Sequence, residues 1–284
     1  MIRIDPLQGE QLKADATVGI VGLGYVGSAV QQHFARAMPV KTYDKPKNIG
    51  DIRDVAKADL IFICVPTPQR AASGACDTSI IDEVVAGIAA NAGKPPLLIV
   101  KSTIPVGYME TLQTRYPAMR FLFSPEFLTE KNAANDFNHC NRVIFGGTHH
   151  NAIEAAAFYR TADPSRWVGN ARTQMYCLPF RGAEMVKLMG NAFLMTKVLF
   201  ANEMYNLCQA AEIDYNAVRY CVALDSRIGP SHLLVPGPDG KHGAGGTCFP
   251  KDMASLINLF EEYQVSQRVL TAVAARNADL RGDL

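Results

Sequence analysis

Residues 18–27, Val-Gly-Ile-Val-Gly-Leu-Gly-Tyr-Val-Gly, carry the pattern that decides the fold. They begin in an apolar run, residues 17–21, that is typical of a buried strand, and continue into Gly22, Gly24 and Gly27 ahead of a helix-like stretch. In such a turn the first glycine permits a tight bend, the second lets backbone approach a pyrophosphate, and the third packs the helix against the strand. The order of strand, glycines and helix therefore predicts a dinucleotide-binding turn.

An acidic residue supports this prediction. Asp44 ends the next predicted strand, residues 40–43, and lies 22 residues after Gly22. A carboxylate at this place binds the ribose hydroxyls and would repel a 2′-phosphate, so we predict NAD rather than NADP as the cofactor. The adjacent Lys45 carries a positive charge that would attract a 2′-phosphate, and this favours NADP instead. The alternative is a glycine-rich turn in an α/β protein that binds no dinucleotide.

The first half of the chain alternates between apolar runs and helix-like stretches. Such alternation indicates a parallel sheet covered by helices on both faces, the Rossmann-type doubly wound α/β fold. The predicted strands span residues 17–21, 40–43, 60–65, 97–101, 120–123 and 142–145. The predicted helices span residues 26–37, 80–92, 108–114 and 151–159.

Two loops follow predicted strands at the expected carboxyl edge of this sheet. Residues 64–68, Cys-Val-Pro-Thr-Pro, follow the third strand, and residues 101–107, Lys-Ser-Thr-Ile-Pro-Val-Gly, follow the fourth. Open α/β sheets bind ligands at this edge, although the prolines could simply end the strands. The predicted cofactor contacts are Gly22, Gly24, Tyr25, Val26, Gly27, Asp44, Lys45, Val65, Pro66, Thr67 and Thr103.

The second half of the chain, from about residue 171, is helical in character. Residues 182–211 contain no proline and are apolar on most sides, so we expect a long helix buried in a large core or a subunit interface. A loop rich in glycine and proline follows over residues 229–248, and a loop of this length is usually functional. Shorter helices are predicted over residues 216–223, 253–262 and 267–278. We predict two domains, residues 1–172 and residues 173–284.

Composition excludes several classes of function. The 28 basic and 27 acidic residues give a formal net charge of +1, so neither nucleic-acid binding nor anchoring on an anionic membrane is expected. No apolar run approaches the roughly 18 residues of a transmembrane helix, and the polar start lacks the apolar region of a signal peptide. The seven cysteines never form C-x-x-C, which disfavours a disulfide framework and a zinc site. We expect a cytoplasmic protein without a bound metal.

Polar residues at regular spacing suggest a site. Glu126 and Glu130 lie four apart, on one face if the stretch is helical, although acids near a helix start are also common on solvated faces. Glu184, Lys187 and Asn191 recur at spacings of three and four on the long predicted helix. A lysine withdrawn from water there would suit proton transfer, and a salt-bridged polar stripe is the alternative.

The glycine-rich segment over residues 243–252 contains Cys248 and Asp252. Its glycines leave backbone amides and room for a close substrate, and a helix start favours the thiolate of a cysteine beside it. A free cysteine is usually a small buried hydrophobe, but a glycine-rich loop is an unusual place for one. Arg227 suits a carboxylate or phosphate, and an ordinary surface arginine is the alternative.

These segments together carry a resemblance that covers nearly the whole chain. GLGYVG, CVPTP, KSTIPVG, SPEFLTE, AEMVKLMGNAF with FANE, DSRIG and GGTCFPKD occur in the order typical of the UDP-glucose/GDP-mannose dehydrogenase family, the nucleotide-sugar dehydrogenases. The resemblance implies a four-electron oxidation in which a primary alcohol of the sugar becomes an acid and two NAD are reduced. The variant Cys-Phe-Pro-Lys-Asp is more similar to the UDP-glucose and GDP-mannose branches than to the N-acetylhexosamine branch. The expected reaction is the oxidation of UDP-glucose to UDP-glucuronate.

The resemblance also implies catalytic roles. Cys248 matches the nucleophile, which traps the aldehyde as a thiohemiacetal and then carries a thioester that water hydrolyses. Lys187 and Asp252 match groups that assist proton transfer and stabilise the oxyanion, and Asn191 matches a hydrogen-bond donor to the substrate. The implied catalytic residues are Cys248, Lys187, Asp252, Asn191, Thr103 and Glu130.

Further matches concern substrate and assembly. Thr103 and Glu130 match residues that order water or the nucleotide and sugar, and Arg227 matches an arginine that reaches the substrate of the partner subunit. A homodimer through the helix over residues 182–211 is implied, and its symmetry would place Arg227 at the other site. The implied substrate contacts are Glu126, Phe127, Leu128, Glu130, Lys187, Asn191, Arg227, Gly245 and Gly246.

Two other functions stay open. A two-electron hydroxyacid dehydrogenase of the related two-domain class also uses a helix lysine with an asparagine four residues later, but it needs no cysteine. A non-catalytic homo-oligomer that binds NAD or a nucleotide sugar is the other. Family members normally continue into a second α/β domain that closes over the nucleotide, so we expect a short form without this C-terminal UDP-binding domain.

Overall fold

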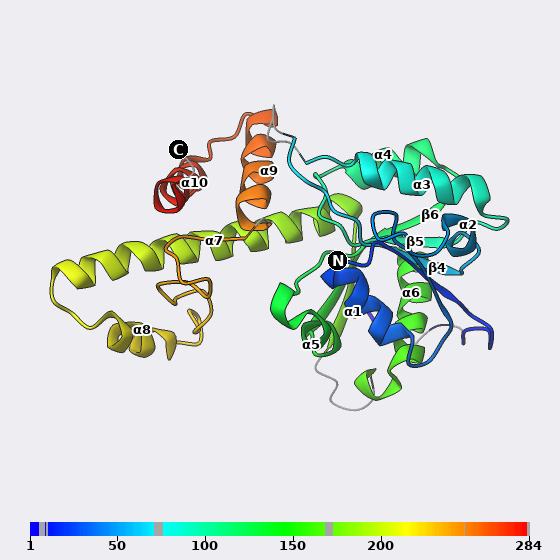
Figure 1. Ribbon diagram of the computed structural model, residues 1–284, viewed down its shortest axis with the longest axis horizontal. Coiled ribbons are helices and arrows are strands. Elements are labelled where there is room, and N and C mark those ends of the chain that lie inside the picture. The colour runs from blue at the N-terminus through cyan, green and yellow to red at the C-terminus, as the bar shows by residue number, and fades with distance from the viewer. Residues whose placement is uncertain (6–8, 10, 71–75, 168–172, 247, 283–284) are drawn as a thin grey trace. The chain divides into compact units, whose positions relative to one another are not determined.

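The computed structural model describes residues 1–5, 9, 11–70, 76–167, 173–246 and 248–282 (Figure 1). The chain divides into two compact units, Met1–Pro68 with Cys76–Lys187 and Gln69–Ala75 with Leu188–Leu284. The division falls inside the longest helix, α7 (Phe180–Ala210), which therefore contributes residues to both units. The domain boundary predicted after residue 172 falls at the edge of an undescribed stretch and stays a prediction.

The described residues of the first unit form an eight-stranded sheet. Its strands are β1 (Ile2–Ile4), β2 (Val18–Val21), β3 (Val40–Tyr43), β4 (Leu60–Ile63), β5 (Leu97–Val100), β6 (Arg120–Phe123), β7 (Arg142–Gly147) and β8 (Gln174–Leu178). Their order across the sheet is β1-β8-β7-β6-β5-β4-β2-β3. The central strands β4 and β5 read LIFI and LLIV, and every residue in them is buried, as strands covered on both faces must be.

Helices cover both faces of this sheet. One apolar core joins the sheet to α1 (Tyr25–Phe34), α5 (Ala133–Asn138) and α6 (His149–Ala162). The other joins it to α2 (Ile52–Val55), α3 (Ser79–Asn91) and α4 (Tyr108–Arg115), and Figure 1 shows the two groups of helices on opposite sides. The predicted doubly wound α/β fold is therefore confirmed.

One edge of the sheet departs from the predicted parallel arrangement. β2 to β6 are parallel, but β7 runs antiparallel to β6, and β1 runs antiparallel to β8. Two neighbouring parallel strands need a crossover connection that carries the chain back to the opposite end of the strands. The connection after β6 contains only a short 3₁₀ turn and the six-residue α5, so the chain enters β7 at the same end of the strands at which it left β6.

The second unit is helical, as predicted. It comprises the rest of α7 together with α8 (Tyr215–Ala223), α9 (Cys248–Glu262) and α10 (Arg268–Arg281). A small apolar core ties the end of α7 to α8 and to the loop that follows, and the hydroxyl of Tyr215 donates to the carbonyl oxygen of Leu233 at 2.8 Å. Within the described residues 229–246 no helix or strand forms, in agreement with the predicted loop.

The apolar character of α7 is only partly satisfied within one chain. Met189, Phe193, Phe200 and Leu207 are 58–68% exposed, and their spacings of four and seven residues place them on one side of the helix. Burial in the chain's own core is therefore wrong for these residues, and burial in a subunit interface stays a prediction. In the described part of the chain, no helix has the length and apolar character needed to cross a membrane.

Candidate active site

The glycine turn between β2 and α1 has the shape that a dinucleotide requires. Gly22 has φ +87°, and a Cβ there would lie 2.8 Å from the carbonyl oxygen of Cys64. A Cβ on Gly27 would lie 1.8 Å from the carbonyl oxygen of Gly22, so the helix can approach the turn only without a side chain. A Cβ on Gly24 would meet nothing within 4 Å, which leaves open space at the N-terminus of α1 where a pyrophosphate fits.

Asp44 lies against this turn, as the predicted ribose contact should. It is 7% exposed, and its Oδ2 accepts the backbone amide of Leu23 at 2.7 Å while Oδ1 accepts that of Lys47 at 3.0 Å. Each carboxylate oxygen retains further acceptor capacity for a ribose hydroxyl. Lys45 turns instead to Glu83, with 2.5 Å between Nζ and Oε1. The hydrogen bonds from these two backbone amides were not predicted, because the sequence pattern describes contacts to the ligand and not contacts within the protein.

The two strand-end loops meet at the carboxyl edge of the sheet. The hydroxyl of Thr67 donates to the carbonyl oxygen of Thr103 at 2.8 Å, and that of Ser102 donates to the carbonyl oxygen of Val65 at 2.6 Å. The structure thus brings three predicted cofactor contacts together, beside the turn that follows β2. Contact of these loops with a cofactor stays a prediction.

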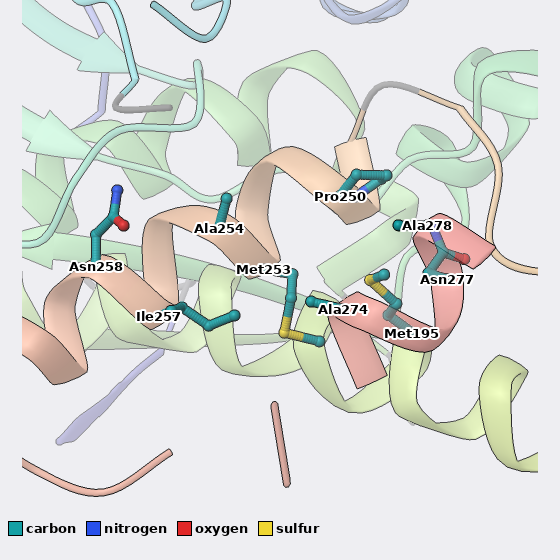
Figure 2. Close-up of a pocket in the computed structure, with 9 residues that line it drawn as sticks. All are labelled: Met195, Pro250, Met253, Ala254, Ile257, Asn258, Ala274, Asn277 and Ala278. Carbon is teal, nitrogen blue, oxygen red and sulfur yellow. The ribbon is translucent and has the colours of Figure 1, made fainter. Parts of the chain in front are cut away.

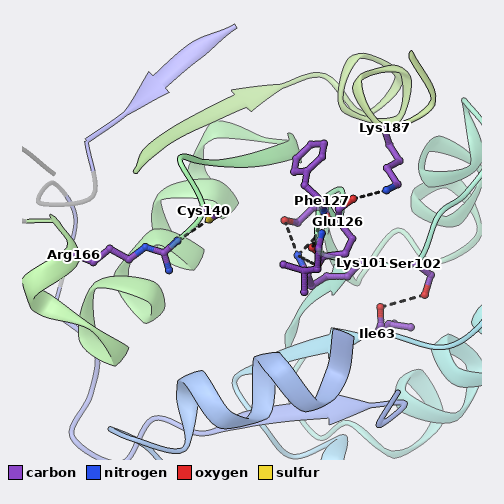
Figure 3. A network of polar contacts seen from close by, with 10 residues as sticks. Ile63, Lys101, Ser102, Glu126, Phe127, Cys140, Arg166 and Lys187 are labelled. Atoms are coloured by element: carbon purple, nitrogen blue, oxygen red, sulfur yellow. Dashed lines mark hydrogen bonds and ion pairs between the residues drawn. The ribbon is translucent and has the colours of Figure 1, made fainter. Parts of the chain in front are cut away.

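A buried ion pair behind these loops was missed by the sequence analysis (Figure 3). Lys101 Nζ lies 3.2 Å from Glu126 Oε2, with side chains 4% and 11% exposed. Burial would lower the pKa of Lys101, but Glu126, together with Tyr159 and Cys64, opposes it and holds that pKa above its ordinary value. Glu126 Oε1 accepts the amides of Phe127 and Leu128 at 2.7 and 3.0 Å, so its carboxylate shapes the loop after β6.

Lys187 joins the same group from α7. Its Nζ donates to the main-chain oxygen of Glu126 and lies 5.9 Å from the centre of the Phe127 ring (Figure 3). The predicted contacts Glu126, Phe127 and Lys187 are therefore neighbours. Glu130 is exposed at the start of the 3₁₀ turn Glu130–Asn132, so it belongs to the rim of this region.

Glu184 does not share the environment of Lys187. It is fully buried, and its carboxylate accepts the amides of Gly107 and Met109 at 2.6 and 3.0 Å at the N-terminus of α4. Burial raises the pKa of this carboxyl. The residue therefore caps a helix, which is the structural alternative to a place in the reaction.

The second unit holds the other group of predicted residues. Asn191 Nδ2 donates to Asp252 Oδ2 at 2.5 Å, and both side chains are buried. Lys251 Nζ lies 3.1 Å from Asp252 Oδ1, although no hydrogen bond to that oxygen forms within the described residues. A buried carboxylate oxygen without a hydrogen-bond donor can accept one from a ligand or a water molecule. Lys251 was missed, although it is adjacent to Asp252 in the chain.

Cys248 is the first residue of α9 and is exposed, as is Cys221 on α8. Asp252 follows it by one helical turn, so the two lie on one face of α9. Arg227 is 88% exposed at its side chain and pairs with Asp225 of its own loop. Its predicted action on a partner's substrate stays a prediction, as does one site that joins the residues of the two units. Within the described residues, no group of three or more His, Cys, Asp or Glu could hold a metal ion.

Comparison with known families gave two matches. Residues 47–163 match the model of the NAD binding domain of the UDP-glucose/GDP-mannose dehydrogenase family. Residues 181–279 match the model of the central domain of the same family. The two matched segments lie in the order that the sequence motifs predicted.

Curated relatives agree with these matches. A UDP-glucose 6-dehydrogenase of Pseudomonas aeruginosa is 34% identical over an alignment of 239 residues that covers 79% of this chain and 49% of that protein. One from Rickettsia typhi is 32% identical over 228 residues, or 79% of this chain and 50% of that protein. The chain spans about half the length of the curated relatives it matches.

Solved structures show the same fold. A UDP-glucose dehydrogenase from Pyrobaculum islandicum aligns with a TM-score of 0.78 and 25% identity, over 95% of this chain and 70% of that one. A 3-hydroxyisobutyrate dehydrogenase from Mycobacterium tuberculosis aligns with a TM-score of 0.74 over 94% of both chains, but at 16% identity it shows the fold alone.

Proposed function

Because the chain belongs to the UDP-glucose/GDP-mannose dehydrogenase family, we propose that it oxidises the primary alcohol of a nucleotide sugar to an acid. The substrate in this proposal is UDP-glucose, and the product is UDP-glucuronate. The curated relatives carry this activity in their names, and the segment Cys-Phe-Pro-Lys-Asp supports the same branch of the family.

The first unit supplies the cofactor site. The open space at Gly24 and the amides at the start of α1 fit a pyrophosphate, and the carboxylate of Asp44 fits the ribose. NAD bound there would accept the hydride from the carbon being oxidised. The buried carboxylate also disfavours the 2′-phosphate of NADP.

The observation that carries the proposal is the group on α9 and α7. An exposed thiol at Cys248 begins α9, and the buried carboxylate of Asp252 follows one turn later, held by Asn191 and Lys251. A nucleophile beside an oriented acid–base group is the arrangement that covalent catalysis requires. A two-electron hydroxyacid dehydrogenase has no use for the thiol.

Four steps follow from these groups. Loss of a hydride and a proton converts the alcohol to an aldehyde, and the Cys248 thiol adds across its C=O bond to give a thiohemiacetal. Loss of a second hydride and proton gives a thioester. Water then breaks the C–S bond, which releases the acid and restores the thiol. Asp252 and Lys187 move the protons, and Asn191 donates a hydrogen bond to the oxygen that becomes negative.

Thr103, Glu126 and Glu130 complete the proposed site from the first unit. Glu126 fixes the backbone of Phe127 and Leu128, while Thr103 and the exposed Glu130 order water and the sugar in this proposal. Gly246 leaves room near Cys248, because a Cβ there would meet nothing within 4 Å. The space beside Gly245 is taken by Asp239 and Arg281 instead, so the predicted substrate contact does not extend to Gly245.

Stoichiometry tests the proposal. The purified protein is mixed with NAD and a panel of nucleotide sugars, and NADH formed per sugar consumed is measured. Two NADH per UDP-glucose support the proposed reaction, and one NADH would favour the hydroxyacid-dehydrogenase type of chemistry. No NADH together with measurable NAD binding would identify a non-catalytic binding protein.

The exposed side of α7 supports a homodimer as part of the same proposal. Met189, Phe193, Phe200 and Leu207 form an apolar row that a second copy would cover, and the symmetry would bring Arg227 to the partner's substrate. Sedimentation equilibrium should show a dimer, and the double substitution Phe193→Asp with Phe200→Asp should give monomers. Leu224→Asp is the matched control, because Leu224 is 69% exposed but lies outside the row. None of the seven cysteines, all of which the structure describes, forms a disulfide, and this supports a cytoplasmic location.

A further inference from the structure

Side chains from two helices hold the loop that precedes Cys248. Asn202 of α7 is 2% exposed, and its Oδ1 accepts the backbone amide of Gly243 at 3.1 Å. Asn277 of α10 is 3% exposed, and its Oδ1 accepts the amide of Ala244 at 2.7 Å. Buried amides must find acceptors, so these two asparagines fix the path of the loop at consecutive residues.

A third side chain, that of Arg281, holds the same loop by binding a main-chain carbonyl and a carboxylate of the loop. Arg281 Nη2 donates to the main-chain oxygen of Gly243 at 2.6 Å, and Nη1 pairs with Asp239 Oδ2 at 2.6 Å. This pair lies so close to Gly245 that a Cβ there would be 2.6 Å from Asp239 Oδ2 and 2.7 Å from Arg281 Nη2. The absence of a side chain at Gly245 is therefore a requirement of the contact.

Helix α10 has a single buried residue. All of its residues are described, and Asn277 is the one that is buried. Between α7, α9 and α10 lies a pocket of about 240 Å³, whose wall includes Met195, Met253 and Asn277 (Figure 2). The pocket leaves apolar packing incomplete here, and the hydrogen bonds of Asn277 and Arg281 attach the C-terminal end of α10 to the loop.

We infer that Asn202, Asn277 and Arg281 form a clamp that positions Cys248 by fixing the backbone of residues 239–246. Cys248 begins α9 two residues after Gly246, so a displaced loop displaces the start of that helix. The three are positioning residues, and none is proposed to touch substrate. The consequence for catalysis rests on the proposed function, whereas the fixing of the loop does not.

The clamp is tested first without any substrate, by hydrogen exchange of the peptide that contains residues 239–246. Arg281→Met and Asn277→Ala should each raise the exchange rate of this peptide at least about fivefold, because their acceptor or donor is lost. Arg276→Met is the matched control: Arg276 is on the same helix, pairs with Asp279 at 3.6 Å and is not part of the clamp. An unchanged exchange rate in both clamp variants, or an equal rise in the control, would overturn the inference.

Thiol reactivity tests the link to Cys248. Alkylation of Cys248 by iodoacetamide is followed by peptide mass spectrometry, with the exposed Cys221 of the same molecule as the internal standard. The ratio of the two rates should change at least about threefold in Arg281→Met and stay unchanged in Arg276→Met. A constant ratio in Arg281→Met, with a folded protein, contradicts a positioning role.

Kinetics separate this inference from the proposed function. In an active enzyme, Asn277→Ala should lower kcat about tenfold while KM for NAD stays within about twofold, because small displacements of a reacting group are costly. Arg281→Lys keeps the positive charge beside Asp239, so its kcat should fall less than that of Arg281→Met. If no nucleotide sugar is oxidised at all, the exchange and alkylation results still decide whether the clamp exists.

Discussion

Two glycine-rich turns in this protein lead into helices, and they are held in different ways. The turn before α1 is shaped mainly by close backbone contacts, since Gly27 packs on Gly22 and Gly22 packs on the backbone of Cys64, and the Asp44 carboxylate adds one hydrogen bond from Leu23. The turn before α9 is shaped by side chains of α7 and α10 that lie 33–41 residues away in the chain. The first turn can be recognised from the spacing of its glycines, whereas the second is defined only by its tertiary partners.

The largest expected effect is that of Cys248→Ser, which should change the function of the turn before α9 and leave that of the turn before α1 intact. Formation of the acid should fall at least about 10³-fold, because a serine hydroxyl is a weak nucleophile without an activating base. NAD binding should persist, because the cofactor contacts lie at the other turn. NADH formation with UDP-glucose and calorimetric NAD titration measure the two effects. Cys221→Ser is the control, and undiminished acid production in Cys248→Ser would remove this thiol from the mechanism.

The backbone-defined turn should break with a single methyl group. Gly27→Ala places a Cβ 1.8 Å from a carbonyl oxygen, so we expect a loss of about 3 kcal/mol in the free energy of unfolding and a loss of NAD binding. Urea denaturation and NAD titration measure both. Gly93→Ala is the matched control, because a Cβ there meets nothing within 4 Å. Equal stability of the two variants would show that the turn is less tightly packed than described.

Asp44→Asn should change the choice of cofactor more than the fold. The amide side chain can still accept from Leu23, but it no longer repels a 2′-phosphate, so NAD should bind about tenfold more weakly and the preference over NADP should shrink. Dissociation constants for both cofactors measure the change. Asp54→Asn on the exposed surface is the control, and unchanged selectivity in Asp44→Asn would argue against the ribose contact.

The smallest expected effect concerns pH. His33, near the end of α1, is fully buried and hydrogen-bonds to Asn138 at 2.8 Å, and its pKa is lowered because burial penalises the imidazolium. Below about pH 6.5 the unfolded chain binds a proton that the folded chain refuses, so stability falls as pH decreases from there toward the folded pKa, by about 1.4 kcal/mol per unit between the two pKa values.

The variant His33→Leu isolates this effect. Urea denaturation at pH 7.5 and pH 5.0 should show a smaller loss of stability on acidification in the variant than in the parent protein. At the other turn Arg281 holds the pKa of Asp239 below its ordinary value, and the substitution leaves that ion pair in place. An identical pH dependence in the variant and the parent would show that His33 titrates equally in both states.

Much of the first unit could be predicted from sequence because its signals are local. Continuous apolar runs identified β4 and β5, and the spacing of glycines and acid identified the cofactor turn. β8 was missed because QMYCL alternates between buried and half-buried positions, and β1 because it has three residues. β7 was predicted as a strand, but its antiparallel direction was not, because strand direction depends on how the connection crosses the sheet.

The site was predicted in its residues but not in its supports. Motif resemblance predicts Cys248, Asp252 and Lys187 as site residues, yet it does not predict that Lys101 pairs with Glu126 or that Arg281 binds the carbonyl of Gly243. These contacts join residues 25 and 38 positions apart, and nothing in the local sequence indicates that they meet. Such supports arise from tertiary packing, which a motif does not encode.

The exposure of the thiols gives the protein a practical property. Cys221 and Cys248 are the exposed cysteines of the seven, and burial raises the pKa of Cys64 to about 12, which suppresses its reactivity at neutral pH. A Cys221→Ser protein would therefore accept a fluorescent maleimide mainly at one place, at the start of α9. The fluorescence of that dye would then report on the surroundings of the start of α9, the place where the glycine-rich loop ends.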